Sequence, residues 1–341
     1  AILPNGRRIT LLKTLLTSAC ERNCYYCPFR AGRDFRRATL KPTEMASAFM
    51  AFHRAGVVQG MFLSSGMRNG GIQTQDQLVA TAEILRNKYR YPGYIHLKLM
   101  PGAEKGQVEA AMQLADRVSI NLEAPNSERL QRLAPTKVFI DELMQPMKWA
   151  AEIRTSLPRH LGWKGRWLSI TTQFVVGAVG ESDLELLSTT SHLYSNLSVS
   201  RAYYSIFHPV EDTPFENLPA APPERENHLY QASFLLRDYG FDLEELPFDM
   251  TGNLPEKMDP KTAWAQPHLA EHPVEINQAE RSDLLRIPGI GPKSADIILA
   301  ARQKGKIISL EELNKLGIRA TRTSPFVLLN GKKPDRQLVF W

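Results

Sequence analysis

The only cysteines of the chain, Cys20, Cys24 and Cys27, lie within eight consecutive residues. Their spacing, C-x3-C-x2-C, allows a tight loop to direct three thiolates at three irons of one [4Fe–4S] cluster, and thiolates are the usual ligands of such clusters. The fourth iron is then left without a protein ligand. Because an open position on a metal is where a substrate or a second cofactor can bind, the spacing predicts a reactive cluster.

Other uses of these cysteines fit the sequence less well. A structural zinc ion takes four ligands, often from two C-x2-C pairs, and neither a second pair nor a nearby histidine accompanies the loop. A disulfide framework needs an even number of cysteines. Unpaired thiols and an oxygen-sensitive cluster are typical of a reducing compartment, so we expect a cytoplasmic protein.

The composition indicates an ordinary globular protein. With 341 residues, the chain has room for two domains, or for one large barrel and a small module. Hydrophobic residues make up 43% and charged residues 23% of the chain, and the net charge is +6. No apolar run is long enough to span a bilayer, so no membrane association is expected.

Strand and helix patterns alternate along most of the chain. Strands are predicted over 9–16, 57–66, 94–100, 118–123, 168–176 and 199–207, and helices over 42–52, 75–90, 104–116, 137–153, 181–194 and 223–239. Such alternation predicts an α/β fold with a parallel sheet and right-handed crossovers. Ligands of parallel barrels bind at the carboxyl ends of the strands, and the cysteine loop follows the first strand.

The other strand ends carry polar or small residues that suit a ligand site. They are Ser64, Ser65 and Gly66 after the second strand, Lys98 on the third, Asn121 and Glu123 on the fourth, and Gln173 and Val175 on the fifth. Tyr204 and His208, on and after the sixth strand, are candidates for proton or hydrogen-atom transfer. The alternative for each of them is ordinary packing or hydrogen bonding at a strand end.

Two basic segments flank the predicted barrel core. Residues 28–41 contain Arg30, Arg33, Arg36 and Arg37 together with two phenylalanines, and residues 154–167 mix cations with tryptophans. Cations interleaved with aromatic rings are typical of surfaces that grip phosphates and stack bases. Solvated surface loops are the alternative for both segments.

The C-terminal part has its own signature. Residues 271–341 hold 12 Lys/Arg against 8 Asp/Glu, and residues 287–294 read Ile-Pro-Gly-Ile-Gly-Pro-Lys-Ser between two short predicted helices. Gly289 and Gly291 allow a tight turn, and the next helix begins with Lys293 and Ser294, where backbone amides can bind phosphate. We expect this turn to contact the DNA backbone without reading sequence; a small protein-docking domain is the alternative.

Prolines mark the boundary between the two parts. Residues 246–273 contain five prolines and little periodicity, which is typical of a semi-extended linker. The predicted domains are therefore a barrel over 1–245, a linker over 246–273 and a DNA-binding module over 274–341.

The cysteine motif resembles the signature of the radical S-adenosylmethionine (radical SAM) superfamily, and residues 287–294 resemble a helix-hairpin-helix motif. The first resemblance implies a partial (β/α)6 barrel, a [4Fe–4S] cluster whose open iron chelates S-adenosylmethionine (SAM), and an adenosyl radical. It also implies that Tyr26 lies against adenine, that Ser64–Gly66 meets the SAM amino group, and that Lys98 meets its carboxylate. Asn121 and Glu123 would meet the ribose or the amine. Gln173 and Val175 belong to a stretch similar to the family's adenine-contacting G-x-I-x-G-x-x-E element.

The two motifs together resemble a bacterial group of DNA modification or repair radical SAM proteins that are linked to a uracil-DNA-glycosylase-like partner. That resemblance implies a nucleotide in DNA as the substrate and an external one-electron reductant. With all three cysteines used by the cluster, no thiol remains to carry a methyl group or donate hydrogen. An enzyme acting on RNA such as tRNA, and a redox-sensing DNA-binding protein, are the alternatives.

Overall fold

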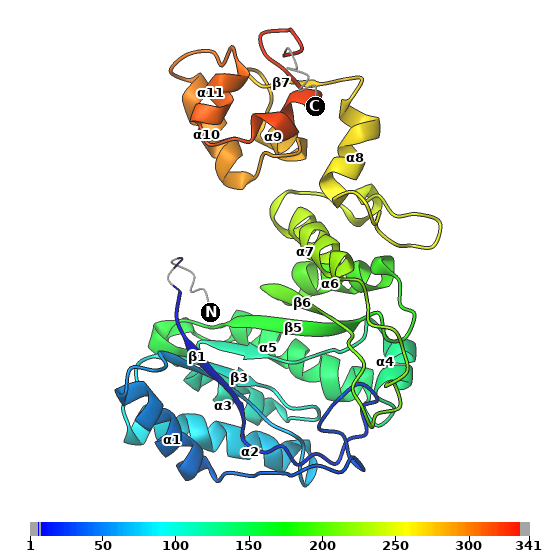
Figure 1. Ribbon diagram of the computed structural model, residues 1–341. Coiled ribbons are helices and arrows are strands. Elements are labelled where there is room, and N and C mark those ends of the chain that lie inside the picture. Colours follow the sequence, from blue (N-terminus) through cyan, green and yellow to red (C-terminus); the bar gives the residue numbers. More distant parts are fainter. Residues whose placement is uncertain (1–5, 7, 335–341) are drawn as a thin grey trace. The chain divides into compact units, whose positions relative to one another are not determined.

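Six parallel strands form one curled sheet, in the order in which they occur in the chain (Figure 1). The computed structural model describes residues 6 and 8–334. The strands are β1 Leu11–Leu15, β2 Gly60–Ser64, β3 Tyr94–Lys98, β4 Arg117–Ser119, β5 Ser169–Val176 and β6 Arg201–Ile206. Helices lie between successive strands, so the predicted partial (β/α)6 barrel is confirmed.

The helices of the barrel match the predicted ones, with helix α4 and two short 3-10 helices in addition. They are α1 Pro42–Arg54, α2 Gly70–Glu83 with a π-helical continuation at Ile84–Lys88, α3 Lys105–Leu114, α4 Ser127–Leu133, α5 Gln145–Ser156 after a π-helix at Phe139–Met144, and α6 Asp183–Leu197. Helix α4 was not predicted, because seven residues are too few for a clear periodicity. Its start is fixed by the Asn126 side chain, which accepts a hydrogen bond from the Arg129 amide. Short 3-10 helices at Arg159–Leu161 and Trp163–Gly165 occupy the basic segment before β5.

The two faces of the sheet differ in polarity, because side chains alternate along each strand. On β3, Ile95 and Leu97 are fully buried, whereas Tyr94, His96 and Lys98 lie on the opposite, inner face. The pairing of β3 with β4 places His96 opposite Arg117 and Lys98 opposite Ser119. The inner face is therefore polar and cationic.

Strand β4 ends earlier than predicted. The Thr172 hydroxyl donates to the Ile120 carbonyl and accepts from the Leu122 amide, which replaces part of the backbone ladder. Pairing resumes at Glu123, which forms a bridge with Phe174 and has a positive φ of 66°. A non-glycine residue in this conformation is uncommon, so the chain turns sharply where Glu123 enters the site.

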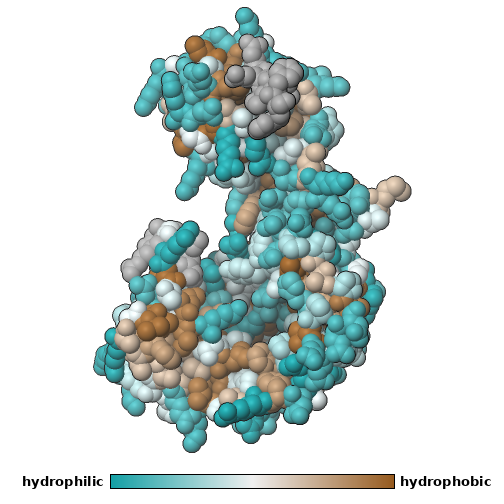
Figure 2. All heavy atoms as spheres, viewed as in Figure 1, coloured by the Kyte–Doolittle hydropathy of each residue, from teal (hydrophilic) through white to brown (hydrophobic). Residues whose placement is uncertain are grey.

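By their internal contacts, the described residues divide into two units. The first comprises residues 1–181 and 192–222, and the second comprises residues 182–191 and 223–341. The predicted boundary at 245 thus lies inside the second unit, and the last seven residues of the predicted third domain lie outside the described residues. No helix in the described ranges is long and apolar enough to cross a membrane. The face seen in Figure 2 is largely hydrophilic, with apolar patches on the first unit.

The second unit is mostly helical. Its elements are α7 Pro223–Asp238, a 3-10 turn at Leu243–Glu245, α8 Pro260–Leu269, β7 Val274–Glu275, α9 Arg281–Arg286, α10 Pro292–Arg302, α11 Leu310–Lys315, α12 Ala320–Thr323, a 3-10 turn at Ser324–Phe326 and β8 Val327–Leu328. Part of the predicted linker is helix α8, which Pro260 opens and Asp259 caps by accepting from the Thr262 amide. Prolines there mark a helix start as well as a linker.

The turn between α9 and α10 is built around two features that the sequence indicated. Ile290 is 1% exposed and belongs to the apolar core of this unit. Gly289 has φ +87°, and a Cβ there would lie 2.7 Å from Thr323 Oγ1. Only glycine combines that backbone conformation with that close approach.

Candidate active site

A cavity of about 210 Å³ lies at the carboxyl ends of β1 to β4. Most of the predicted ligand-binding residues line it, namely Cys20, Cys24, Cys27, Tyr26, Ser64, Ser65, Gly66, Lys98, Asn121 and Glu123. Arg22 and Lys137 also line it and were not predicted. Residues from four separate segments thus converge at the end of the sheet where parallel barrels bind ligands.

The cysteine loop is held in place by contacts outside the thiols. The Arg22 guanidinium donates to the Thr136 carbonyl and forms a 2.5 Å ion pair with Glu142. The Glu21 amide donates to the Met67 carbonyl at 2.8 Å. These bonds join the loop to the segment before α5 and to the turn after β2, so the fold itself positions the thiols.

The environment of the thiols suits metal-bound thiolates. The Met67 amide donates to Cys20 Sγ and the Phe29 amide to Cys27 Sγ, both at 3.4 Å, and such bonds tune iron–sulfur clusters. Burial raises the pKa of Cys24, and it raises the pKa of Cys27 to about 12. These thiols are therefore protonated at neutral pH until a metal displaces the protons.

Among the described residues, no group of three or more His, Cys, Asp or Glu side chains is arranged to hold a single metal ion. A mononuclear zinc site needs such convergence, whereas in a cluster each thiolate binds a different iron.

A buried ion pair forms the wall opposite the cysteines. Lys137 Nζ lies 3.0 Å from Glu123 Oε1, and the two side chains are only 9% and 7% exposed. Burial opposes ionisation of Glu123, but Lys137 and Lys98 hold the pKa of that carboxyl below its usual value. Glu123 Oε2 has no hydrogen-bond partner among the described residues. The carboxylate is thus charged, and a hydrogen bond from the Tyr26 phenol to the carboxylate also lowers its pKa.

Tyr26 and Lys98 flank this carboxylate. Burial and the charge of Glu123 raise the pKa of the Tyr26 phenol well above its usual value, so the ring is neutral. The Lys98 ammonium donates to Asn121 Oδ1. Burial lowers the pKa of Lys98 to about 7.

The turn after β2 approaches the cysteine loop closely. A Cβ at Gly66 would lie 2.4 Å from the Ala19 carbonyl oxygen, so only glycine fits there. The neighbouring Ser65 hydroxyl is buried and has no hydrogen-bond partner among the described residues. Buried polar groups are normally paired, which makes Ser65 a candidate ligand contact.

Gln173 and Val175 do not line this cavity. The Gln173 carbonyl accepts from the Glu123 amide at 3.0 Å, and the Val175 amide donates to the Glu123 carbonyl at 2.7 Å. These backbone bonds hold Glu123 in its strained conformation. In the next turn the Glu181 carboxylate accepts from the amides of Gly177 and Val179, so it organises the G-x-x-E stretch.

The structure separates the two candidate catalytic residues from the cavity. Tyr204 is 1% exposed and stacks on Phe174, because it alternates onto the helix-covered face of β6. Its neighbour Tyr203 lies on the inner face, opposite Gln173. His208 is exposed, in the segment after β6. The structure thus places Tyr203, and not Tyr204, on the inner face of the sheet.

The four arginines of residues 28–41 differ in how many hydrogen bonds they form to the backbone of their own loop. Arg37 donates to four backbone carbonyls, those of Ser18, Phe29, Arg30 and Arg33, and its guanidinium lies 4.1 Å from the Phe35 ring centre. Arg33 donates to the carbonyls of Pro28 and Glu211. Arg30 is half-buried near the Tyr25 ring, and Arg36 is exposed. Arg37 is therefore structural, and Arg36 is the one fully exposed cation of the four.

The hairpin residues of the second unit are arranged as predicted. Gly291 immediately precedes α10, whose first turn holds an exposed Lys293 and a half-buried Ser294. From α8, the Lys261 ammonium donates to the Ile290 carbonyl at 2.5 Å and fixes the turn. The exposed start of α10 offers backbone amides and a cation together.

Comparisons with known proteins agree with both sites. Residues 14–166 match the family described as the radical SAM superfamily, and residues 270–317 match the helix-hairpin-helix motif. No match is found among the curated proteins.

Solved structures show the same fold at low identity. Methylornithine synthase (PylB) superposes with a TM-score of 0.52 and 15% identity, over 68% of this chain and 63% of that one. The FeFe-hydrogenase maturase HydG from Carboxydothermus hydrogenoformans gives a TM-score of 0.51 and 17% identity, over 68% and 52%. The chain thus covers less than two thirds of the length of either structure.

Residues 14–166 thus match the radical SAM superfamily, whose members use a [4Fe–4S] cluster and SAM, and the sheet has the fold of the solved structures named above. The chain combines this radical SAM domain with a helix-hairpin-helix motif, which suggests nucleic-acid binding.

The residues present fit both cofactors. Cys20, Cys24 and Cys27 would hold the cluster at the mouth of the cavity. Beyond them, the buried Ser65 hydroxyl and Glu123 Oε2 are polar atoms without partners among the described residues, as expected of groups that meet a polar ligand. The Lys98 ammonium suits the carboxylate of SAM, and Glu123 suits its amine or ribose hydroxyls.

We expect SAM affinity to depend on the charge of Lys98. Since its pKa is about 7, Lys98 is protonated below pH 7 and loses its charge as the pH rises. The ratio of wild-type to Lys98→Met affinity should be largest near pH 6 and fall by up to about tenfold per unit above pH 7. Equilibrium binding of SAM to cluster-loaded protein measures this ratio. Taking the ratio cancels the titration of SAM itself, and a ratio independent of pH would contradict the assignment.

Proposed function

We propose that this protein is a radical SAM enzyme that repairs or modifies a nucleotide in DNA by abstracting a hydrogen atom from it. The observation that carries the proposal is the presence of a helix-hairpin-helix motif and a radical SAM domain in one chain. The cationic inner face of the barrel supports a phosphate-bearing substrate. The resemblance to DNA modification or repair proteins adds a uracil-DNA-glycosylase-like partner to the proposal, and the unpaired thiols and oxygen-sensitive cluster add a cytoplasmic location.

Held by Cys20, Cys24 and Cys27, a cluster reduced by an external one-electron donor would, together with SAM, supply 5′-deoxyadenosyl radical chemistry at this site. The protein's own residues bind and orient. Glu123, Lys98 and Asn121 fix SAM beside the cysteine loop, and the buried cavity wall excludes water from the radical. The target nucleotide must leave the helix stack, or be single-stranded, to reach the strand ends.

The function is tested by anaerobic turnover with duplex DNA, single-stranded DNA and tRNA as separate additions. We expect DNA to stimulate formation of 5′-deoxyadenosine, with deuterium from labelled DNA found in that product by mass spectrometry. Stimulation by tRNA alone would favour the RNA enzyme. If no nucleic acid changed SAM cleavage, the proposal would fail.

The hairpin is expected to supply much of the DNA affinity. Lys293→Glu should weaken binding to duplex DNA by about tenfold or more and reduce its salt dependence, because it replaces a phosphate-binding cation with a repelling anion. Lys257→Glu, an equally exposed charge reversal in the same unit, is the matched control. Fluorescence anisotropy measures the affinities, and visible absorbance verifies that the cluster is intact. Equal affinities for the two variants would argue against DNA binding by the hairpin.

A further inference from the structure

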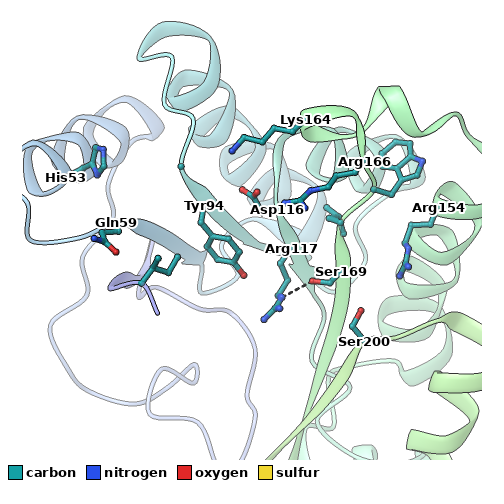
Figure 3. A pocket seen from close by; sticks show the side chains of 14 residues that line it. His53, Gln59, Tyr94, Asp116, Arg117, Arg154, Lys164, Arg166, Ser169 and Ser200 are labelled. Carbon is teal, nitrogen blue, oxygen red and sulfur yellow. Dashed lines mark hydrogen bonds between the residues drawn. The ribbon is translucent and has the colours of Figure 1, made fainter. Parts of the chain in front are cut away.

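A second cavity, of about 760 Å³, lies at the amino ends of the barrel strands (Figure 3). It is lined by residues that begin or directly precede the strands, namely Ile9, Gln59, Tyr94, Arg117, Ser169 and Ser200. Tyr94 and Arg117 lie on the same inner face as Lys98, at the other end of the strands. The cavity is therefore distinct from the candidate active site, and its volume suits a nucleotide-sized ligand.

Four cations line this cavity. Arg117 comes from β4, Arg154 from α5, and Lys164 and Arg166 from the segment before β5 (Figure 3). In the described part of the chain none of the four forms an ion pair. Their hydrogen bonds go to neutral atoms: Arg117 to Ser169 Oγ at 2.9 Å, Arg154 to the Ser198 carbonyl at 2.9 Å, and Lys164 to the Pro92 carbonyl at 2.7 Å.

The acidic residue of the lining does not balance these charges. Asp116 is already paired with Arg86 at 3.1 Å, and both side chains are almost fully buried. The positive field extends along the inner face, because Arg117, Lys98 and Lys13 add to burial in lowering the pKa of His96. A concave surface with unbalanced positive charge attracts and binds anions.

Aromatic rings and hydroxyl groups complete the lining. Tyr94 and Trp167 contribute rings, and Trp167 is fixed by a 3.0 Å hydrogen bond from its Nε1 to the Leu157 carbonyl. Burial raises the pKa of Tyr94 to about 12, so its phenol is neutral. Rings of this kind stack on bases, while Ser169, Ser200 and Gln59 offer hydrogen bonds.

We propose that this cavity binds a nucleotide, with its phosphates on Arg117, Arg154, Lys164 and Arg166 and its base against Tyr94 or Trp167. The nucleotide is either free or part of a nucleic-acid strand. The proposal goes beyond the DNA reaction and does not rest on it, because the cavity lies at the opposite end of the strands from the cysteine loop.

The test compares two double variants of the full, cluster-loaded chain. Lys164→Ala/Arg166→Ala removes two exposed cations of the cavity, and Lys88→Ala/Lys148→Ala removes two exposed lysines outside it. Binding of ATP, adenosine and a 5′-phosphorylated ten-residue oligothymidylate is measured by calorimetry. The oligonucleotide is measured in a Lys293→Glu background, so that the hairpin does not mask the result.

We expect the cavity variant, but not the control, to lose about tenfold or more in affinity, since charge-assisted hydrogen bonds to phosphate are lost. Loss for ATP identifies a free nucleotide, and loss for the oligonucleotide alone identifies a strand. The proposal is overturned if both variants bind both ligands as the parent does, if the parent binds neither, or if adenosine binds as tightly as ATP. Because the readout is binding, a failure of the DNA reaction would leave this result unaffected.

Discussion

Cys24→Ser is expected to abolish cluster binding and to reduce SAM cleavage to background. Cys24 is the most buried of the three thiols, and a serine hydroxyl does not replace a thiolate as an iron ligand. Iron and sulfide content, visible absorbance and 5′-deoxyadenosine formation measure the loss. Two remaining thiolates cannot fix three irons, so partial occupancy should not restore turnover.

The matched control for this variant is Tyr25→Phe in the same loop, which keeps the ring that contacts Phe215. It should retain the cluster and its activity. A Cys24→Ser protein with full iron content and normal SAM cleavage would disprove the role of the loop. So would wild-type protein that binds zinc after anaerobic supply of iron and sulfide.

Glu123→Ala is expected to lower the free energy of unfolding by about 3–5 kcal/mol, because it leaves the Lys137 ammonium buried without its partner. The same change should abolish measurable SAM binding, since it removes the carboxylate from the cavity wall. Denaturant unfolding of the cluster-free protein measures the first effect, and equilibrium binding to the loaded protein measures the second.

The double variant Glu123→Ala/Lys137→Met separates these two effects. With both members of the ion pair removed, it should regain most of the lost stability, because replacing a buried pair by apolar groups is often neutral. It should not regain SAM binding. Recovery of binding together with stability would show that Glu123 acts only by holding the fold.

The sequence predicted the barrel well, because each of its six strands is a short apolar run that is followed by an amphipathic helix. It was less informative where a single side chain changes the backbone. Thr172 interrupts the β4 ladder through its hydroxyl, and neither this nor the positive φ of Glu123 is visible as a pattern. Helix α8 was missed because prolines also begin helices.

The part of the candidate site that lies at the strand ends was predicted from the sequence. Lys98, Asn121 and Glu123 were found because each lies at a predicted strand end, and the structure brings them to one cavity. Lys137 was missed because it comes from a loop between two helices and no pattern marks it. The second cavity was not predicted, because the residues at the amino ends of strands β1 to β6 form no motif. The basic segment 154–167, with its tryptophans, nevertheless supplies part of its lining.

The stretch from Thr136 to Glu142 touches both halves of the candidate site. Its members bind Arg22 and Asn23 in the cysteine loop, and Lys137 binds Glu123 after β4. None of these bonds depends on iron. Protein groups therefore tether the cysteine loop from outside the thiols, and we expect iron and sulfide supplied anaerobically after oxidative loss of the cluster to restore it without refolding of the chain.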